Sequence, residues 1–244
     1  MDTVVLNESI SEWLRQRSHN ESRESTSRFR MSQAGKCRRQ IAFEARSFPR
    51  DLPLTDATLR NFAAGDVWHE LCQAWLADSF GAECEVECEL KLPRGEIMTG
   101  HADALVVIGE RREVWEIKSM APYSWDRAVK GTRTSEPEGV RSDHVLQASL
   151  YAVALKAQTV VVGYVNRATG EWATEDVAIS TSDVDNFLLQ IDYISGLIDS
   201  HLLPARVIDG KVIESPDAST APWQCRYCPW QPTCSKMQSG LVSQ

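Results

Sequence analysis

The sequence has no long hydrophobic run and no secretory leader. No apolar stretch approaches the roughly 18 residues that a membrane span requires. The amino terminus, MDTVVLNESI, also lacks the basic segment followed by an apolar one that marks a signal peptide. These absences argue against a membrane or secreted protein, and we expect a soluble protein in the cytoplasm.

The sequence is also short of positive charge. Its 244 residues include 34 acidic and 26 basic ones, for a net charge of -8, which argues against a protein that coats nucleic acid nonspecifically. Residues 28–50 are an exception, because they hold seven basic side chains and a single acidic one, Glu44. They form either a local patch for phosphates or a solvated basic surface.

A disulfide framework is not expected, because the seven cysteines are odd in number and no leader directs the chain to an oxidising compartment. Three of them follow a Cys-x2-Cys-x5-Cys spacing at Cys225, Cys228 and Cys234. Zinc sites and cubane iron–sulfur clusters bound only by cysteine need four thiols. The candidates for the fourth are Cys37, Cys72, Cys84 and Cys88.

The four candidates differ in their predicted surroundings. Cys72 lies on the apolar stripe of a helix predicted over residues 56–78 and is interpreted as a core residue. Cys84 and Cys88 share one face of a predicted strand, where their sulfurs are too far apart to bind one metal without distortion. Cys37 lies at the otherwise polar start of a helix that Ser32 would cap.

Hydrophobic periodicity predicts an α/β or α+β protein with helices packed on a sheet. The polar residues 1–27 are expected to form a loosely held arm, and residues 120–142 and the tail from Leu203 to be irregular. The segments 84–92, 100–109 and 113–119 alternate or are strongly apolar, which predicts a β-meander, and 159–179 predicts a hairpin. Helices are predicted over 33–46, 56–78, 144–157 and 182–202, the last capped by Ser182 or Asp183.

Charged side chains interrupt two of these apolar strands. Glu116 and Lys118 lie two residues apart in EVWEIKS, so both side chains point to one face of the strand. If the two strands pair through the GERR turn, Asp103 comes opposite Glu116. A divalent cation between the two carboxylates would remove their repulsion. Such an ion, with the positive charge of Lys118 beside it, suits the hydrolysis of a phosphodiester bond. The alternative is a structural salt bridge between Lys118 and a buried carboxylate.

The ordered set of motifs resembles the RecB-like branch of the PD-(D/E)XK nuclease superfamily. The matching elements are a helical His, then G-x-x-D and E-x-K on consecutive strands, then Q-x-x-x-Y on a helix. They correspond here to His69, to Gly100–Asp103, to Glu116–Lys118, and to Gln147 with Tyr151. Ala102 replaces the proline of the superfamily's name, which RecB-like members commonly lack.

The resemblance implies roles for these residues. It implies that His69, Asp103, Glu116 and the main-chain carbonyl of Ile117 bind Mg²⁺ or Mn²⁺. Lys118 would then be catalytic with Glu116 and Asp103, while Gln147 and Tyr151 support the active site and the DNA.

The cysteines extend the resemblance to the iron–sulfur members of this branch, which include CRISPR-associated adaptation nucleases and their phage-borne relatives. These carry one cysteine before the nuclease core and three after it. The resemblance therefore implies a [4Fe-4S] cluster on Cys37, Cys225, Cys228 and Cys234, acting mainly as a structural staple. A zinc site with the same ligands has the same spacing and stays open.

The fold implied by the resemblance is an α/β restriction-endonuclease-like core, with a mixed or antiparallel central sheet flanked by helices. Residues 1–27 would form a polar arm and 28–240 a single domain. Within it, 53–202 would be the nuclease core, and 28–50 with 203–240 would form a small iron–sulfur cap that joins the terminal segments. The stapled helix also carries Lys36, Arg38 and Arg39, which would contact DNA.

The implied function is exonucleolytic hydrolysis of single-stranded DNA ends, in recombination, repair or CRISPR spacer acquisition, with DNA and proteins of those processes as partners. Two alternatives stay open. One is a noncatalytic DNA-end-binding or regulatory protein on the same fold, against which the intact Asp103, Glu116 and Lys118 argue. The other is a zinc-stapled nucleic-acid-binding module, in which the acidic pair would have no purpose.

Overall fold

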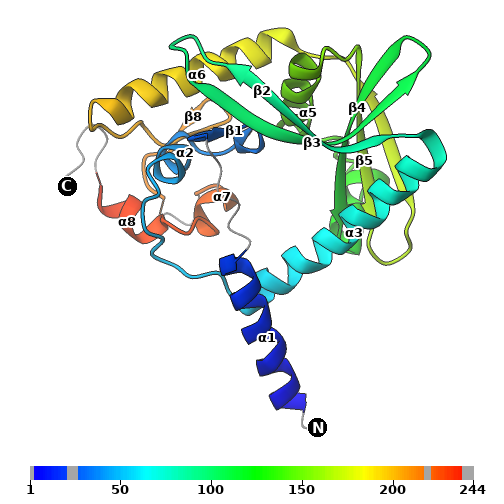
Figure 1. Ribbon diagram of the computed structural model, residues 1–244. Coiled ribbons are helices and arrows are strands. Elements are labelled where there is room, and N and C mark those ends of the chain that lie inside the picture. Colours follow the sequence, from blue (N-terminus) through cyan, green and yellow to red (C-terminus); the bar gives the residue numbers. More distant parts are fainter. Residues whose placement is uncertain (1–2, 21–26, 217–220, 238–244) are drawn as a thin grey trace.

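The computed structural model describes residues 3–20, 27–216 and 221–237, and its centre is a mixed β-sheet (Figure 1). The strands run in the order β1-β3-β4-β5-β6, and β2 pairs with β3 beside this path. These strands are β1 Phe29–Arg30, β2 Glu83–Lys91, β3 Ile97–Ile108, β4 Arg111–Met120, β5 Thr159–Asn166 and β6 Trp172–Val177.

Antiparallel and parallel pairings are combined in this sheet. β2, β3 and β4 form an antiparallel meander, and β5 and β6 an antiparallel hairpin, as predicted. β4 pairs with β5 in parallel, because a helix connects the two strands, and β1 is parallel to β3. The predicted mixed sheet with flanking helices is therefore confirmed.

Two helices pack on opposite faces of the central strands. On β4, Ile117 faces α3, where it packs with Cys72 and Leu76, whereas its neighbours Glu116 and Lys118 point to the other face. Helix α5 packs against β4 and β5 on that second face. The helices are α1 Thr3–Asn20, α2 Arg38–Ala45, α3 Asp56–Phe80, α4 Pro122–Trp125, α5 Ser142–Leu155, α6 Thr181–Asp199, α7 Trp223–Arg226 and α8 Gln231–Lys236.

The long helices begin and end at recognisable caps. The Thr55 side chain accepts a hydrogen bond from the Thr58 N–H at the start of α3, and Gly81 ends that helix in the left-handed conformation. Ser180 caps α6 by accepting from the Asp183 N–H. The predicted cap at Ser182 or Asp183 was therefore wrong by two or three residues.

The segment around Ser32 differs from the predicted helix. A short 3-10 helix, η1 (Met31–Gln33), comes first, and α2 begins only after Cys37. Gly35 separates the two because its φ of 73° lies in the left-handed region, and a Cβ there would collide with the Cβ of Asp143. The close approach of α5 therefore interrupts the helix that periodicity predicts.

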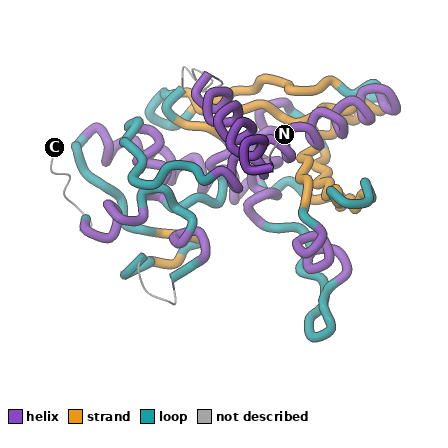
Figure 2. Tube along the Cα trace, turned by 90° about the horizontal axis from the view of Figure 1, so that it is seen from below, coloured by secondary structure: helices purple, strands orange, loops and turns teal. Residues whose placement is uncertain are grey.

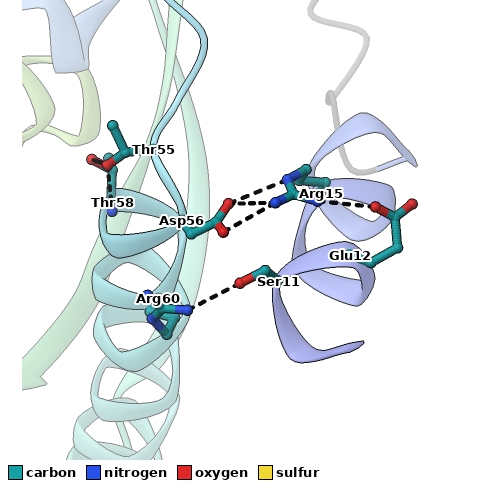
Figure 3. A network of polar contacts seen from close by, with 7 residues as sticks. All are labelled: Ser11, Glu12, Arg15, Thr55, Asp56, Thr58 and Arg60. Carbon is teal, nitrogen blue, oxygen red and sulfur yellow. Dashed lines mark hydrogen bonds and ion pairs between the residues drawn. The ribbon is translucent and has the colours of Figure 1, made fainter. Parts of the chain in front are cut away.

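The polar amino-terminal segment also differs from the predicted loose arm, because residues 3–20 form helix α1. Leu14 is buried, and Arg15 donates two hydrogen bonds of 2.8 and 3.0 Å from Nη2 to the Asp56 carboxylate of α3. Arg60 of α3 donates to the Ser11 hydroxyl at 3.0 Å (Figure 3). These polar contacts attach α1 to the start of α3, while the rest of α1 projects away from the sheet (Figure 1).

Residues 120–142, predicted as irregular, contain helix α4 followed by one turn of π-helix, η2 (Asp126–Lys130). Trp125 and Ala128 are buried in the main core. The prolines and glycines of this segment predicted a loop. Burial of Trp125 in the core stabilises short helices that would not form in isolation.

The carboxyl-terminal tail packs against the segment around α2. It contains a small hairpin, β7 (Val207–Ile208) and β8 (Lys211–Val212), followed by α7 and α8. Thr233 donates two hydrogen bonds to the Asp51 carboxylate, at 2.9 Å from N–H and 2.6 Å from Oγ1, and Trp230 Nε1 donates to the Phe48 carbonyl at 3.0 Å. Short helices and loops therefore gather at one end of the molecule, away from β4–β6 (Figures 1 and 2).

Within the described residues, no helix is both long enough and apolar enough to cross a membrane.

Gly100 on β3 allows α5 to lie close to the sheet. A Cβ at this position would lie 2.5 Å from Tyr151 Cε1 and 3.1 Å from Met31 Cβ, and both of those side chains are buried. Gly65 in α3 is a matched contrast, because its Cβ would meet only Arg167 Nη2 at 3.6 Å.

We expect Gly100→Ala to lower the free energy of unfolding by about 1–3 kcal/mol through overpacking. Gly65→Ala should instead raise it by up to about 1 kcal/mol through helix propensity. Urea unfolding followed by circular dichroism measures both changes at matched metal content. A Gly100→Ala protein as stable as the unsubstituted one would contradict the inferred packing.

Candidate active site

Two carboxylates meet where β3 and β4 pair. Ala104 pairs with Trp115 in the antiparallel register, which places Asp103 across from Glu116. Glu116 is completely buried, and Asp103 is 8% exposed. The Ile117 N–H donates a hydrogen bond of 2.6 Å to Asp103 Oδ2, so the backbone of β4 holds this carboxylate in place.

Lys118 points to the same face as Glu116, as the strand alternation predicts, and its Nζ contacts Glu116 Oε1. Neither carboxylate oxygen of Glu116 makes a well-aligned hydrogen bond within the described residues. Burial, reinforced by the charge of Asp103, raises the pKa of Glu116 to about 8. Burial opposes the charged form of Lys118, but the attraction of Glu116 and Asp103 outweighs it and raises the Lys118 pKa.

His69 reaches this pair from α3. Its Nε2 lies 3.1 Å from Asp103 Oδ1, a contact that raises the pKa of His69. The sequence-predicted His69, Asp103, Glu116 and Lys118 are therefore brought together. The Ile117 carbonyl also faces β3, because N–H and C=O of one strand residue point to the same neighbouring strand.

Glu85 is a third acidic residue at this position that the sequence argument missed. It lies on β2 with a left-handed φ of 52°, and its Oε1 lies 3.9 Å from His69 Nδ1. Gln73 of α3 donates from Nε2 to both Glu85 Oε1 (2.8 Å) and the Asp103 carbonyl (2.9 Å). The positive φ of Glu85 and its approach to His69 follow from the folded backbone, so only the structure shows them.

Helix α5 supplies the second wall of the site. Gln147 Nε2 donates to the Tyr151 hydroxyl at 3.0 Å, and burial raises the pKa of Tyr151. His144 lies on the same helical face, and its Nδ1 is 2.9 Å from the Tyr164 hydroxyl. Burial lowers the pKa of His144 to about 4, so the ring is neutral near pH 7. His144 was also missed, although its i, i+3 and i+7 spacing with Gln147 and Tyr151 was visible in the sequence.

Lys118 opens into a solvent-accessible groove of about 290 Å³, which we call the Lys118 groove. Its walls come from η1 and α2, from α5 and from α7. They consist of Ser32, Ala34, Gly35, Lys36, Gln40, Lys118, Arg141, Asp143, His144, Gln147, Trp223, Gln224, Tyr227 and Cys228.

The residues suit a hard divalent cation in donor type. Two carboxylates and an imidazole converge, and the Glu116 oxygens are buried without aligned hydrogen-bond donors. In the described part of the chain, no three His, Cys, Asp or Glu side chains already stand in an arrangement that holds a metal ion. An ion would therefore require side-chain movements, including a shift of Lys118 from Glu116.

The four cysteines assigned to a cluster line one cavity. Cys37 precedes α2, and Cys225, Cys228 and Cys234 come from the tail, yet all four face the same space. All are free thiols, and three are buried while Cys228 is half-buried. Cys72 belongs to the core under α3, as predicted, and Cys84 and Cys88 lie on β2 and do not line this cavity.

Two guanidinium groups border the thiol cavity. Arg206 Nε lies 3.3 Å from Cys234 Sγ, and Arg39 Nη1 lies 4.0 Å from the same sulfur. Arg39 is completely buried and donates to the carbonyls of Pro204 and Met237 at 3.0 Å each. Its burial lowers its pKa. Buried cations need compensating negative charge, which thiolate ligands would provide.

The structure places the three predicted DNA-binding residues in different surroundings. Arg39 is buried beneath the tail, so it cannot reach a DNA backbone, and that prediction is corrected. Arg38 donates from Nε to Gln190 Oε1 of α6 at 2.9 Å and does not line the Lys118 groove. Lys36 pairs with Glu44 at 3.0 Å and lines the groove.

Comparison with known proteins shows a likeness in fold. No family model and no curated protein matches the sequence. The crystal structure of SSO0001 superposes with a TM-score of 0.61 at 17% identity, over 96% of this chain and 98% of that one. At this identity the likeness supports the fold alone.

Two further solved structures show weaker likeness. The alkaline exonuclease LHK-Exo from Laribacter hongkongensis gives a TM-score of 0.49 at 8% identity, and its complex with dAMP gives 0.46 at 12%. Each comparison covers 67% of this chain and 78% of the other. Both scores are too low to bear on the chemistry of this chain.

The carboxylate pair predicts that metal binding stabilises the folded chain. We expect Mn²⁺ to raise the melting temperature, because the ion removes repulsion between Asp103 and Glu116 and binds only the folded state. At a metal concentration of about 100 times Kd, the gain is about 2.7 kcal/mol. Thermal unfolding with and without Mn²⁺ measures it.

In Asp103→Asn and Glu116→Gln this gain should be mostly lost. Asp176→Asn, which changes an exposed carboxylate on β6, is the control and should keep the full shift. Equal Mn²⁺ shifts in all four proteins would refute the metal site.

Proposed function

We propose that this protein is a metal-dependent deoxyribonuclease that shortens DNA from single-stranded ends. The observation that carries the proposal is the meeting of Asp103, Glu116 and Lys118 at a buried point, from which Lys118 reaches the Lys118 groove. His69 completes the donor set from a separate helix.

A divalent cation bound by these residues would activate water and neutralise charge on a phosphate oxygen. The chain's own groups supply the remaining functions. Asp103 is oriented by the Ile117 N–H, and Glu116 is held in a dry environment, where a bound cation would favour its charged form and attract it strongly. Lys118 keeps its proton, so its amine can stabilise negative charge that develops on the scissile phosphate.

A purely structural salt bridge explains the site less well. Such a pair would be stabilised by aligned hydrogen bonds to both partners, whereas the Glu116 oxygens have none within the described residues. A second carboxylate, Asp103, is placed across from Glu116 and adds repulsion. An arrangement in which Lys118 alone offsets two neighbouring carboxylates suits metal-dependent chemistry better than structural support or noncatalytic DNA binding.

We further propose that Cys37, Cys225, Cys228 and Cys234 hold a [4Fe-4S] cluster as a staple. The support is their shared cavity and the two guanidinium groups beside Cys234, which match the negative charge of a thiolate-bound cluster. A cluster here would join α2 to the tail, and it would reinforce the hydrogen bonds of Thr233 and Trp230.

The nuclease proposal predicts that Lys118→Ala loses at least roughly a hundredfold in rate, because the charge on the scissile phosphate is no longer stabilised. The measurement is the shortening of end-labelled single-stranded DNA with Mg²⁺ or Mn²⁺. Lys91→Ala removes an exposed lysine from β2 and should keep full activity. An active Lys118→Ala protein would exclude the assigned role, and circular dichroism establishes that both variants fold.

The cluster proposal predicts a brown protein after anaerobic purification, with broad absorbance near roughly 400 nm and about four irons per chain. Cys37→Ser should lose iron and soluble yield, whereas Cys84→Ser should retain iron because Cys84 lies outside the cavity. A colourless protein with stoichiometric zinc would reject the cluster.

A further inference from the structure

Two aromatic side chains at the rim of the Lys118 groove are exposed without an evident structural reason. Trp223 is 48% exposed and Tyr227 is 81% exposed, although their chain neighbours Gln224 and Cys228 line the buried thiol cavity. Leaving two large apolar rings in water is unfavourable, and such rings are typical of surfaces that bind a partner.

The backbone holds these rings in place. They lie one helical turn apart on and just after α7, where the Tyr227 N–H donates to the Trp223 carbonyl at 3.2 Å. Cys225 and Cys228 alternate with them along the chain and turn inward to the cavity. The inward thiols therefore direct the two rings outward, with centroids 6.4 Å apart.

Basic and neutral polar groups connect this rim with Lys118. The Arg141 guanidinium lies 5.6 Å from the centre of the Trp223 ring, and Lys36 lines the same groove. Asp143 is the one acidic residue of the lining, and it is paired with Arg141. Lys36, Lys118 and Arg141 therefore line the groove with a single lining carboxylate, Asp143, while Lys36 and Lys118 also pair with Glu44 and Glu116 behind it.

Aromatic rings next to cations are the chemistry that binds single-stranded nucleic acid, since bases stack on the rings while phosphates follow the positive charges. A duplex offers no free base faces, because its bases stack on one another. The glutamine side chains of the lining, Gln40, Gln147 and Gln224, can donate or accept and so tolerate any base edge.

We propose that Trp223 and Tyr227 form a stacking platform for the bases of a single DNA strand, whose phosphates pass Arg141 and Lys36 to reach Lys118. The inference deepens the proposed nuclease function and rests on it for the direction of the strand. The two rings that would favour single strands lie on the cysteine-bearing tail at the groove rim. They are not among the residues proposed to carry out hydrolysis.

The test measures binding apart from cleavage. Fluorescence anisotropy with no added divalent metal compares labelled oligothymidylate with a strand of the same length made of abasic sites. The unsubstituted protein should bind the base-bearing strand about tenfold or more tightly, and Trp223→Ala/Tyr227→Ala should lose this preference while binding the abasic strand as before.

Two controls separate stacking from structure. Trp223→Phe/Tyr227→Phe keeps the rings and should retain most of the preference. Tyr193→Ala removes an exposed ring from α6 outside the groove and should change nothing. The platform is overturned if the double alanine variant keeps the preference, or if it loses affinity for both strands equally with unchanged iron content and folding.

The same proteins separate this inference from the proposed function. If the preference for bases depends on the two rings but no metal supports cleavage, the platform stands and the nuclease proposal fails. If DNA is cleaved and the preference does not depend on the rings, the nuclease proposal stands and the platform fails.

Discussion

The site depends on one constraint, the burial of two neighbouring carboxylates between β3 and β4. The Ile117 N–H holds Asp103 from the backbone of the adjoining strand, so the strand register that forms the sheet also sets the distance between Asp103 and Glu116. A buried carboxylate beside another is unfavourable unless positive charge offsets it. Lys118 supplies one charge, and a divalent cation would supply more. The proposed chemistry and the local stability therefore depend on the same electrostatic balance.

The cysteine-bearing end of the molecule and the carboxylate site share walls. Cys228 borders both the thiol cavity and the Lys118 groove, and Lys36 directly precedes Cys37 in the chain. Arg39 and Arg206 lie inside this end beside Cys234, whereas Trp223 and Tyr227 lie on its outer rim. In the functional proposals, the staple that joins the terminal segments also sets the position of the groove rim. Loss of the staple would then displace the groove rim and weaken substrate binding first. The carboxylate site, which lies on β3 and β4, would be affected only afterwards.

Much of the sheet could be predicted from the sequence, because period-two alternation and tight turns are local signals. The meander containing Asp103 and Glu116 and the β5–β6 hairpin formed where the pattern placed them. The secondary-structure predictions failed where a contact with a residue far away in the chain determined the local conformation. The predicted helix over 33–46 begins late, at Arg38, because Gly35 packs against Asp143, and Trp125 stabilises helical turns in an expected loop by entering the core. The polar amino-terminal segment forms α1, whose Leu14 is buried and whose Arg15 and Ser11 contact Asp56 and Arg60 of α3.

For the site, residue order and strand alternation were enough to place Glu116 and Lys118 on one face and Asp103 across from Glu116, since both follow from the geometry of an extended backbone. Chain folding alone decided which residues from other segments join them. It placed Glu85 at the site, buried Arg39 beneath the tail, and set Trp223 and Tyr227 at the groove rim. These placements depend on packing between segments far apart in the chain, which has no local period to reveal it.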